Sequence, residues 1–150
     1  MRSAMYAAFA LLLGAGPVPA QSADRIDRVS ARNFETTVKQ LETALQGQGF
    51  MIVSRADHQN MLKMVGATVK GARTIDFGRP DMMKMHLPAH PEIGLEMPMR
   101  FYLWERGDGK TVVSYRKPSA IFGGYGSDDL KMMGGMMDGM FDQLATAATK

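Results

Sequence analysis

The chain has 150 residues, of which 15 are methionine and none is cysteine, and its formal net charge at neutral pH is +3. A chain of this length forms one domain around a single hydrophobic core. Without cysteine there is no disulfide framework, no thiolate metal site and no cysteine nucleophile. The basic residues are scattered along the sequence, so we do not expect nucleic acid to be a partner.

The first 20 residues have the pattern of a secretory signal peptide. Arg2 gives a positive start, the apolar run 5–13 is too short to span a bilayer, and small residues precede Ala20. The alternative, a buried N-terminal helix, is disfavoured by the glycines and prolines of 14–19. We expect cleavage after Ala20, with cleavage after Ala23 as the alternative, and a periplasmic or secreted product. No later stretch is apolar enough to span a membrane, so no stable membrane insertion is expected after cleavage.

The mature chain is expected to consist of residues 21–150, and its first half alternates between strand and helix patterns. Asn33 and Asp57 are placed to act as helix N-caps, and Asp81 is placed to cap a helical turn that Pro88 and Pro91 keep short. The pattern predicts a strand over 25–31, a helix over 34–46, a strand over 50–55, a short helix over 58–64 and a strand over 73–77.

Residues 97–115 predict a β-hairpin. Met97, Met99, Phe101 and Leu103 alternate with residues of the opposite face, the turn 107–109 is Gly-Asp-Gly, and 111–115 is β-branched and aromatic. Gly109-Lys110-Thr111 imitates the end of a phosphate-binding loop. The first glycine of that motif is missing and a strand follows instead of a helix, so we reject the motif.

The C-terminal part predicts a Gly-rich loop over 119–126 and then a long helix that begins at Ser127. The apolar line of this helix consists of Leu130, Met133, Met137, Met140 or Phe141, and Leu144. Three glycines, at 134, 135 and 139, are expected on the opposite side, and each costs about 1 kcal/mol relative to alanine. The helix should therefore hold only when it is docked. The whole order predicts a single α+β domain with an antiparallel-rich sheet and helices on one face.

Several short stretches of the sequence match the motifs of a known family in their order and spacing. The stretches are 34–38 (FETTV), 49–50 (GF), 55–58 (RADH), 77–80 (FGRP), 97–100 (MPMR), 107–110 (GDGK) and 115–118 (YRKP). Together they resemble the family called domain of unknown function 302, a set of small, mostly bacterial proteins. The chain departs from the family at Arg79, where Asn is usual, and at Met97 and Met99, where Leu is usual.

The resemblance implies a compact fold of the TATA-binding-protein-like class, with the order strand, helix, four strands, helix, and often a homodimer. It implies no established reaction and no catalytic residues. The methionine-rich C-terminal helix and the cluster at 82–85 are not features of the family, so they belong to this chain in particular.

Methionine and histidine are the only soft side chains available to an exported protein without thiols, and thioethers bind Cu(I) or Ag(I). One candidate cluster lies on the last helix, a second on the short helix after Asp57, and a third precedes Pro88. The first cluster consists of Met132, Met133, Met136, Met137 and Met140. The second consists of His58, Met61 and Met64, and the third of Met82, Met83, Met85 and His86. The alternative interpretation is that methionine fills the core or coats an interface.

The outer face of the hairpin suggests a binding surface instead. If Met99, Phe101 and Leu103 pack under the helices, the intervening side chains point the other way. These are Arg100, Tyr102 and Trp104, and we expect Tyr115 near them. Such residues are enriched in binding hot spots, and a sheet covered on one side leaves this face for a dimer partner or ligand.

No pattern predicts an enzyme. His86 and His90 lack the intervening Glu of a zinc hydrolase and are separated by Pro88, and no Gly-x-Ser-x-Gly elbow occurs. A cleft that gathers a histidine with a carboxylate would revive the enzyme interpretation. We expect an exported, non-enzymatic binding or accessory protein, with Cu(I) binding or capture of a protein or small ligand as its alternatives. No cofactor is required by the sequence beyond a possible Cu(I).

Overall fold

The structure, a computed structural model, describes residues 24–150, so the predicted signal peptide lies outside the described residues. Its elements are β1 (Arg25–Val29), α1 (Phe34–Gly47), β2 (Met51–Asp57), α2 (His58–Lys63), β3 (Ala72–Gly78), α3 (Pro80–His86), the 3-10 helix η1 (Pro91–Glu96), β4 (Met99–Glu105), β5 (Thr111–Arg116), α4 (Pro118–Gly123) and α5 (Asp128–Thr149).

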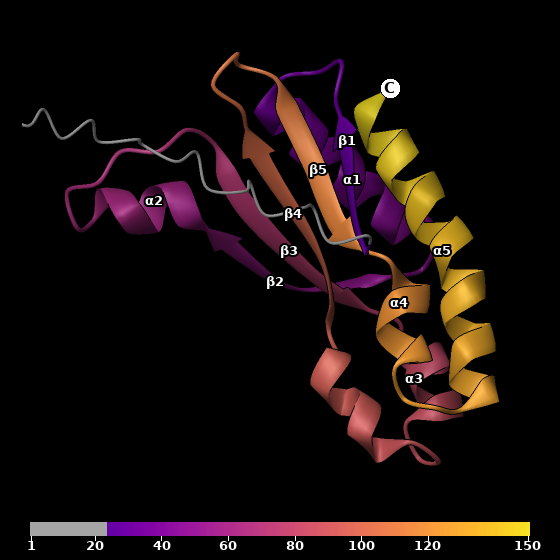
Figure 1. The fold of residues 1–150 in the computed structure, drawn as a ribbon. Coiled ribbons are helices and arrows are strands. Elements are labelled where there is room, and N and C mark those ends of the chain that lie inside the picture. Colours follow the sequence, from indigo (N-terminus) through magenta and orange to yellow (C-terminus); the bar gives the residue numbers. More distant parts are fainter. Residues whose placement is uncertain (1–23) are drawn as a thin grey trace, which may run out of the picture.

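The strands form one antiparallel sheet in the order β1-β5-β4-β3-β2. The long helices α1 and α5 lie together against one face of this sheet (Figure 1). The predicted α+β architecture, with the order strand, helix, four strands, helix and both helices on one face, is therefore confirmed.

Aromatic rings fill the layer between the sheet and the helices. Phe101 of β4 lies between its neighbours, with its ring centroid 5.2 Å from that of Phe77 and 5.1 Å from that of Phe141 on α5. Tyr115 of β5 completes the group, 5.6 Å from Phe141. All three phenylalanines are buried, and offset aromatic pairs of this kind stabilise a core beyond the area they bury.

The helix starts follow the predicted caps at three of four positions. The side chains of Asn33 and Asp57 each accept a backbone N–H three residues on, at 2.9 Å, and Ser127 does so at 3.4 Å. The prediction for Asp81 is wrong. Helix α3 begins at Pro80 and its N-cap position is Arg79, two residues before Asp81, because proline suits the first turn of a helix.

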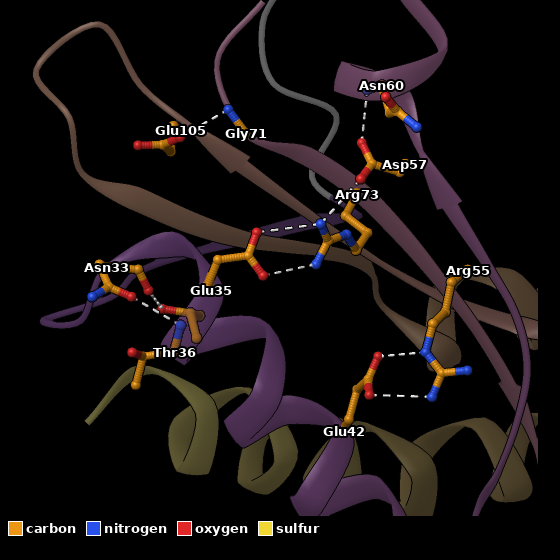
Figure 2. A network of polar contacts seen from close by, with 11 residues as sticks. Asn33, Glu35, Thr36, Glu42, Arg55, Asp57, Asn60, Gly71, Arg73 and Glu105 are labelled. Atoms are coloured by element: carbon orange, nitrogen blue, oxygen red, sulfur yellow. Dashed lines mark hydrogen bonds and ion pairs between the residues drawn. The ribbon is translucent and has the colours of Figure 1, made fainter.

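Ion pairs fasten α1 to the neighbouring strands (Figure 2). Arg73 of β3 donates to Glu35 in the first turn of α1 and to Asp57 at the end of β2, each at 3.1 Å. Arg55 of β2 donates at 2.7 Å to Glu42, which lies seven residues after Glu35 on α1. The backbone N–H of Asn60 and then Arg73 hold the pKa of Asp57 below its usual value. This network positions α1 on the sheet and gives its residues a structural role.

The sequence predicted a loop over the whole segment 119–126, and this prediction is wrong for most of it. Helix α4 occupies most of it, because Pro118 suits its first position and Phe122 is fully buried. Asp138 of α5 accepts from the backbone N–H and hydroxyl of Ser119, at 2.9 Å and 2.6 Å.

The α4–α5 contact also corrects the prediction for Gly134. This residue is buried against α4, whereas Gly135 and Gly139 are exposed as expected. A Cβ at Gly134 would lie 2.9 Å from the Cα of Ser119. The absence of a side chain is therefore what allows the two helices to approach each other.

Candidate functional site

The sheet has an outer face, turned away from α1 and α5 (Figure 1). No helix of residues 24–150 covers this outer face as α1 and α5 cover the inner one. In β4, the inner positions Met99, Phe101 and Leu103 are buried. Arg100, Tyr102 and Trp104 occupy the alternate positions, so they lie on the outer face as the alternation predicts.

Tyr115 does not join them, and this prediction is wrong. It pairs with Ile26 of β1, its ring contacts Phe101 and Phe141 of the core, and only 6% of its surface is exposed. Burial raises the pKa of its hydroxyl above the ordinary value. The reason is register, since the outer positions of β5 are those of Val112, Ser114 and Arg116.

The register brings three arginines to one end of the outer face. Arg25 of β1 lies directly opposite Arg116 of β5. Tyr102 of β4 lies opposite Ser114 of the antiparallel β5. Arg100, two residues before Tyr102, and Arg116, two residues after Ser114, therefore share the same end. Of these three arginines, only Arg100 was predicted from the sequence to lie on a binding face. The hairpin alone would have placed Arg116 beside it, but the pairing of β1 with β5 has no local signal.

Two of the arginines are held by carboxylates. Asp76 of β3 accepts from Arg100 Nε at 2.7 Å and from the Ser54 hydroxyl at 2.7 Å. The bond from Arg100 holds the pKa of Asp76 below its usual value, against the opposing effect of burial. Arg25 Nε donates to Asp27 at 2.8 Å. Within residues 24–150, no carboxylate forms an ion pair with Arg116, whose side chain is exposed.

Hydrogen bonds also fix the side chains in the middle of the outer face. Trp104 Nε1 donates to the Ser114 hydroxyl at 2.9 Å, and that hydroxyl donates to Asp27 at 2.7 Å. On the other side, His58 Nε2 lies 2.6 Å from the Thr74 hydroxyl, and its ring contacts Tyr102 edge to face. The aromatic side chains of this face are therefore fixed in position by hydrogen bonds and ring contacts.

The three arginines line one cavity of about 530 Å³. Tyr102 and Ser114 contribute to its floor. An apolar wall on the other side comes from the segment before β4 and from α4, through Leu95, Met97, Pro98 and Ile121. Glu96, a carboxylate in the lining, accepts a hydrogen bond from the Tyr125 hydroxyl at 2.8 Å. The cavity thus combines cationic groups with an apolar surface.

The methionines predicted as one metal cluster on α5 are divided between two sides of the helix. Met133 and Met137 are buried, Met140 is partly buried, and Met132 and Met136 are 62% and 65% exposed. This last pair lies off the apolar line predicted for the helix, so the five side chains do not gather on one side. On α2, His58 turns to the sheet while Met61 and Met64 point outward, 58% and 81% exposed.

His86 and His90, which Pro88 separates in the sequence, both lie against Asp129 at the start of α5. Their nearest ring nitrogens are 3.4 Å and 3.7 Å from the same carboxylate oxygen. A backbone bond from His90 N–H to the carbonyl of His86 continues the helical turn and brings them together. Among residues 24–150, no three His, Cys, Asp or Glu side chains are arranged to hold a metal ion, and neither histidine lines the arginine cavity.

No helix in the part of the chain that the structure describes is long and apolar enough to cross a membrane. The family model described as "Domain of unknown function DUF302" matches residues 26–148. A crystal structure titled as an uncharacterized conserved DUF302 protein from Bacillus stearothermophilus superposes with a TM-score of 0.74 at 16% identity, covering 85% of this chain and 97% of the other.

Two curated relatives are fluoride-specific ion channels, FluC 1 of Brucella suis and FluC 1 of Brucella abortus. Each is 26% identical to this chain over 90 residues, which is 60% of this chain. The matched part is 35% of the first relative and 33% of the second. The chain therefore spans about a third of the length of these relatives.

Proposed function

The chain belongs to the DUF302 family, and on that premise we propose that it is an exported, non-enzymatic binding protein that takes a small anionic ligand in the arginine cavity. The observation that carries the proposal is the convergence of Arg25, Arg100 and Arg116 from three adjacent strands on one cavity.

Electrostatics favours an anion at this point. Like charges directly opposite each other on neighbouring strands destabilise a sheet, and Arg25 and Arg116 are such a pair. Asp27 compensates Arg25, but Arg116 has no carboxylate partner among the described residues. A bound carboxylate or phosphate would relieve this repulsion, and the guanidinium group suits either because it donates two parallel hydrogen bonds.

The geometry suits binding more than catalysis. Asp76 holds Arg100 in place, and its lowered pKa keeps it ionised at neutral pH, so it is a poor general acid or base there. The pair formed by His86 and Asp129 lies outside the cavity. The apolar wall at Met97 and Pro98 favours a ligand that carries a short hydrocarbon part beside its charged group.

Calorimetric titration of the mature chain tests the proposal with three probes: octanoate, inorganic phosphate and fluoride. Fluoride is included because the Brucella relatives are named as fluoride channels. Octanoate should bind most tightly, since it alone uses both the arginines and the apolar wall. Failure of all three probes to bind would overturn the proposal.

Arg116→Gln should weaken binding about tenfold, or about 1.4 kcal/mol. The matched control is Arg106→Gln, because Arg106 lies at the turn of the hairpin, where it pairs with Asp108, and does not line the cavity. Equal affinity in the two variants would remove Arg116 from the site.

Export is proposed on the sequence pattern of residues 1–20. Expression of the whole chain in a Gram-negative host should place it in the periplasm with Gln21 as its first residue. N-terminal sequencing of the fractionated protein measures this directly. Retention of Met1 in the cytoplasmic fraction would contradict export and leave the binding proposal to its own test.

A further inference from the structure

A second cavity lies on the other side of the Met97–Pro98–Met99 segment, between α3, the start of β4 and α5. It has a volume of about 350 Å³ and a mostly apolar lining, to which Arg79, paired with Asp81 at 2.8 Å, also contributes. Three separate parts of the chain supply thioether side chains to it. These are Met82 and Met83 from α3, Met97 and Met99 around the start of β4, and Met133 and Met137 from α5.

Methionine is concentrated in the lining of this cavity. Six of the 13 methionines in residues 24–150 face this one cavity. Leucine would fill the same apolar volume at similar stability, but only a thioether can act as a soft ligand. With no cysteine in the chain, thioethers are its only sulfur ligands.

The polarity of the cavity selects the charge of the ion. A buried charge is expensive to desolvate, so neutral ligands in an apolar cavity favour a monovalent ion over a divalent one. Soft sulfur ligands select Cu(I) among the biological metals. We propose that this cavity is a Cu(I) site, with Met133 and Met137 of α5 and the methionines of α3 as its ligands. Residues 97–99 line both cavities, but the proposed ligands from α3 and α5 line only this one, so the inference can be tested separately from the anion site.

The docking of α3 explains what the metal would change. No residue of α3 is fully buried, and Met82 and Met83 are only partly covered. Met133 and Met137, by contrast, are 2% and 4% exposed on a helix that packs into the core. An ion shared between the two elements would tie α3 to α5, so Cu(I) binding should also stabilise the folded chain.

The test is an anaerobic titration of the mature protein with Cu(I) in competition with bicinchoninate. The structure predicts that the protein withdraws one equivalent of Cu(I) from the chelator. The double variant Met133→Leu/Met137→Leu should bind at least tenfold more weakly, while circular dichroism shows an unchanged fold. The matched control, Met132→Leu/Met136→Leu on the exposed side of the same helix, should bind like the natural sequence.

A second readout assigns the ligands directly. With [methyl-13C]methionine in the protein and Ag(I) as a redox-inert substitute, the methyl resonances of the cavity residues should shift and those of Met132 and Met136 should not. Three results would overturn the proposal: no competition with the chelator, undiminished binding in the cavity variant, or loss of binding in the control. Failure here leaves the octanoate result untouched, so the two proposals are tested separately.

Discussion

Gly134→Ala probes how closely α4 and α5 approach each other. The added Cβ would lie 2.9 Å from Ser119 Cα, 3.0 Å from the Pro118 carbonyl oxygen and 3.2 Å from the Pro118 carbonyl carbon. All three are backbone atoms in the first turn of α4. Because no side chain can rotate away, the whole of α4 must move to accommodate one methyl group.

Two effects of opposite sign set the free energy of this change. Alanine has the higher helix propensity and favours the variant by about 1 kcal/mol. Overpacking in a close contact costs about 1–3 kcal/mol, and a shift of α4 also disturbs Phe122 and the hydrogen bonds between Ser119 and Asp138. We therefore expect Gly134→Ala to lose up to about 2 kcal/mol of unfolding free energy, combining these two magnitudes.

Gly135→Ala is the matched control on the same helix, since nothing lies within 4 Å of its added Cβ. It should gain up to about 1 kcal/mol from helix propensity alone. Urea unfolding followed by circular dichroism at the helix band measures both variants. If Gly134→Ala proves as stable as Gly135→Ala, the close approach of α4 and α5 is refuted.

Two further predictions concern the outer face of the sheet. Asp76→Asn should lose about 1–2 kcal/mol at pH 7, a value reduced for the exposure of its partner Arg100. Since the folded pKa of Asp76 is lowered, its contribution is fully present above the unfolded pKa near 4 and is lost as the pH falls through the folded value. Urea unfolding should therefore show the difference between the two proteins shrinking below pH 4, and a constant difference would contradict this role. We also propose that the chain forms a homodimer through the outer face of the sheet. Trp104→Ala should then sediment as a monomer where the natural chain sediments as a dimer; a dimeric variant would exclude Trp104 from the contact.

The fold was predictable because its signals are local. Asn33, Asp57 and Ser127 each cap a helix through their own side chains, and the alternation in 97–104 fixes which face of β4 is buried. The errors occur where tertiary contacts decide. Helix α4 depends on burial of Phe122 against α5, and Gly134 appears to be a weak helix residue until its contact with Ser119 is known.

The candidate sites were less predictable because register, rather than sequence spacing, assembles them. Arg25 and Arg116 are separated by 90 residues and meet only because β1 pairs with β5. Tyr115 is a residue type expected on the outer face, yet it pairs with Ile26, and this register directs its side chain toward the core. The excess of methionine was visible in the sequence, but helix spacing alone could not show that Met133 and Met137 face Met82 and Met83 across a cavity.

The segment between β3 and β4 supplies walls to both cavities and is not needed to join the strands. Phe77 and Met99 pair directly across the sheet, and antiparallel neighbours can be connected by a two-residue turn. Replacement of residues 80–96 by Asn-Gly should therefore leave a chain that unfolds cooperatively in urea. It should be less stable, because the fully buried Ile93 is removed and a lost side chain of this size costs about 2–5 kcal/mol.

This variant should not bind Cu(I), because it lacks the α3 methionines of the second cavity. It should bind octanoate more weakly, because Leu95 is removed from the apolar wall of the first cavity while Met97, Pro98 and Ile121 remain. Calorimetry and chelator competition on the same preparation measure both. A variant that fails to fold would show that the segment belongs to the core of the domain. A folded variant with both affinities intact would place the two sites elsewhere. A folded variant that has lost Cu(I) binding and binds octanoate more weakly would show that residues 80–96 complete both sites on a sheet and helices that fold without them.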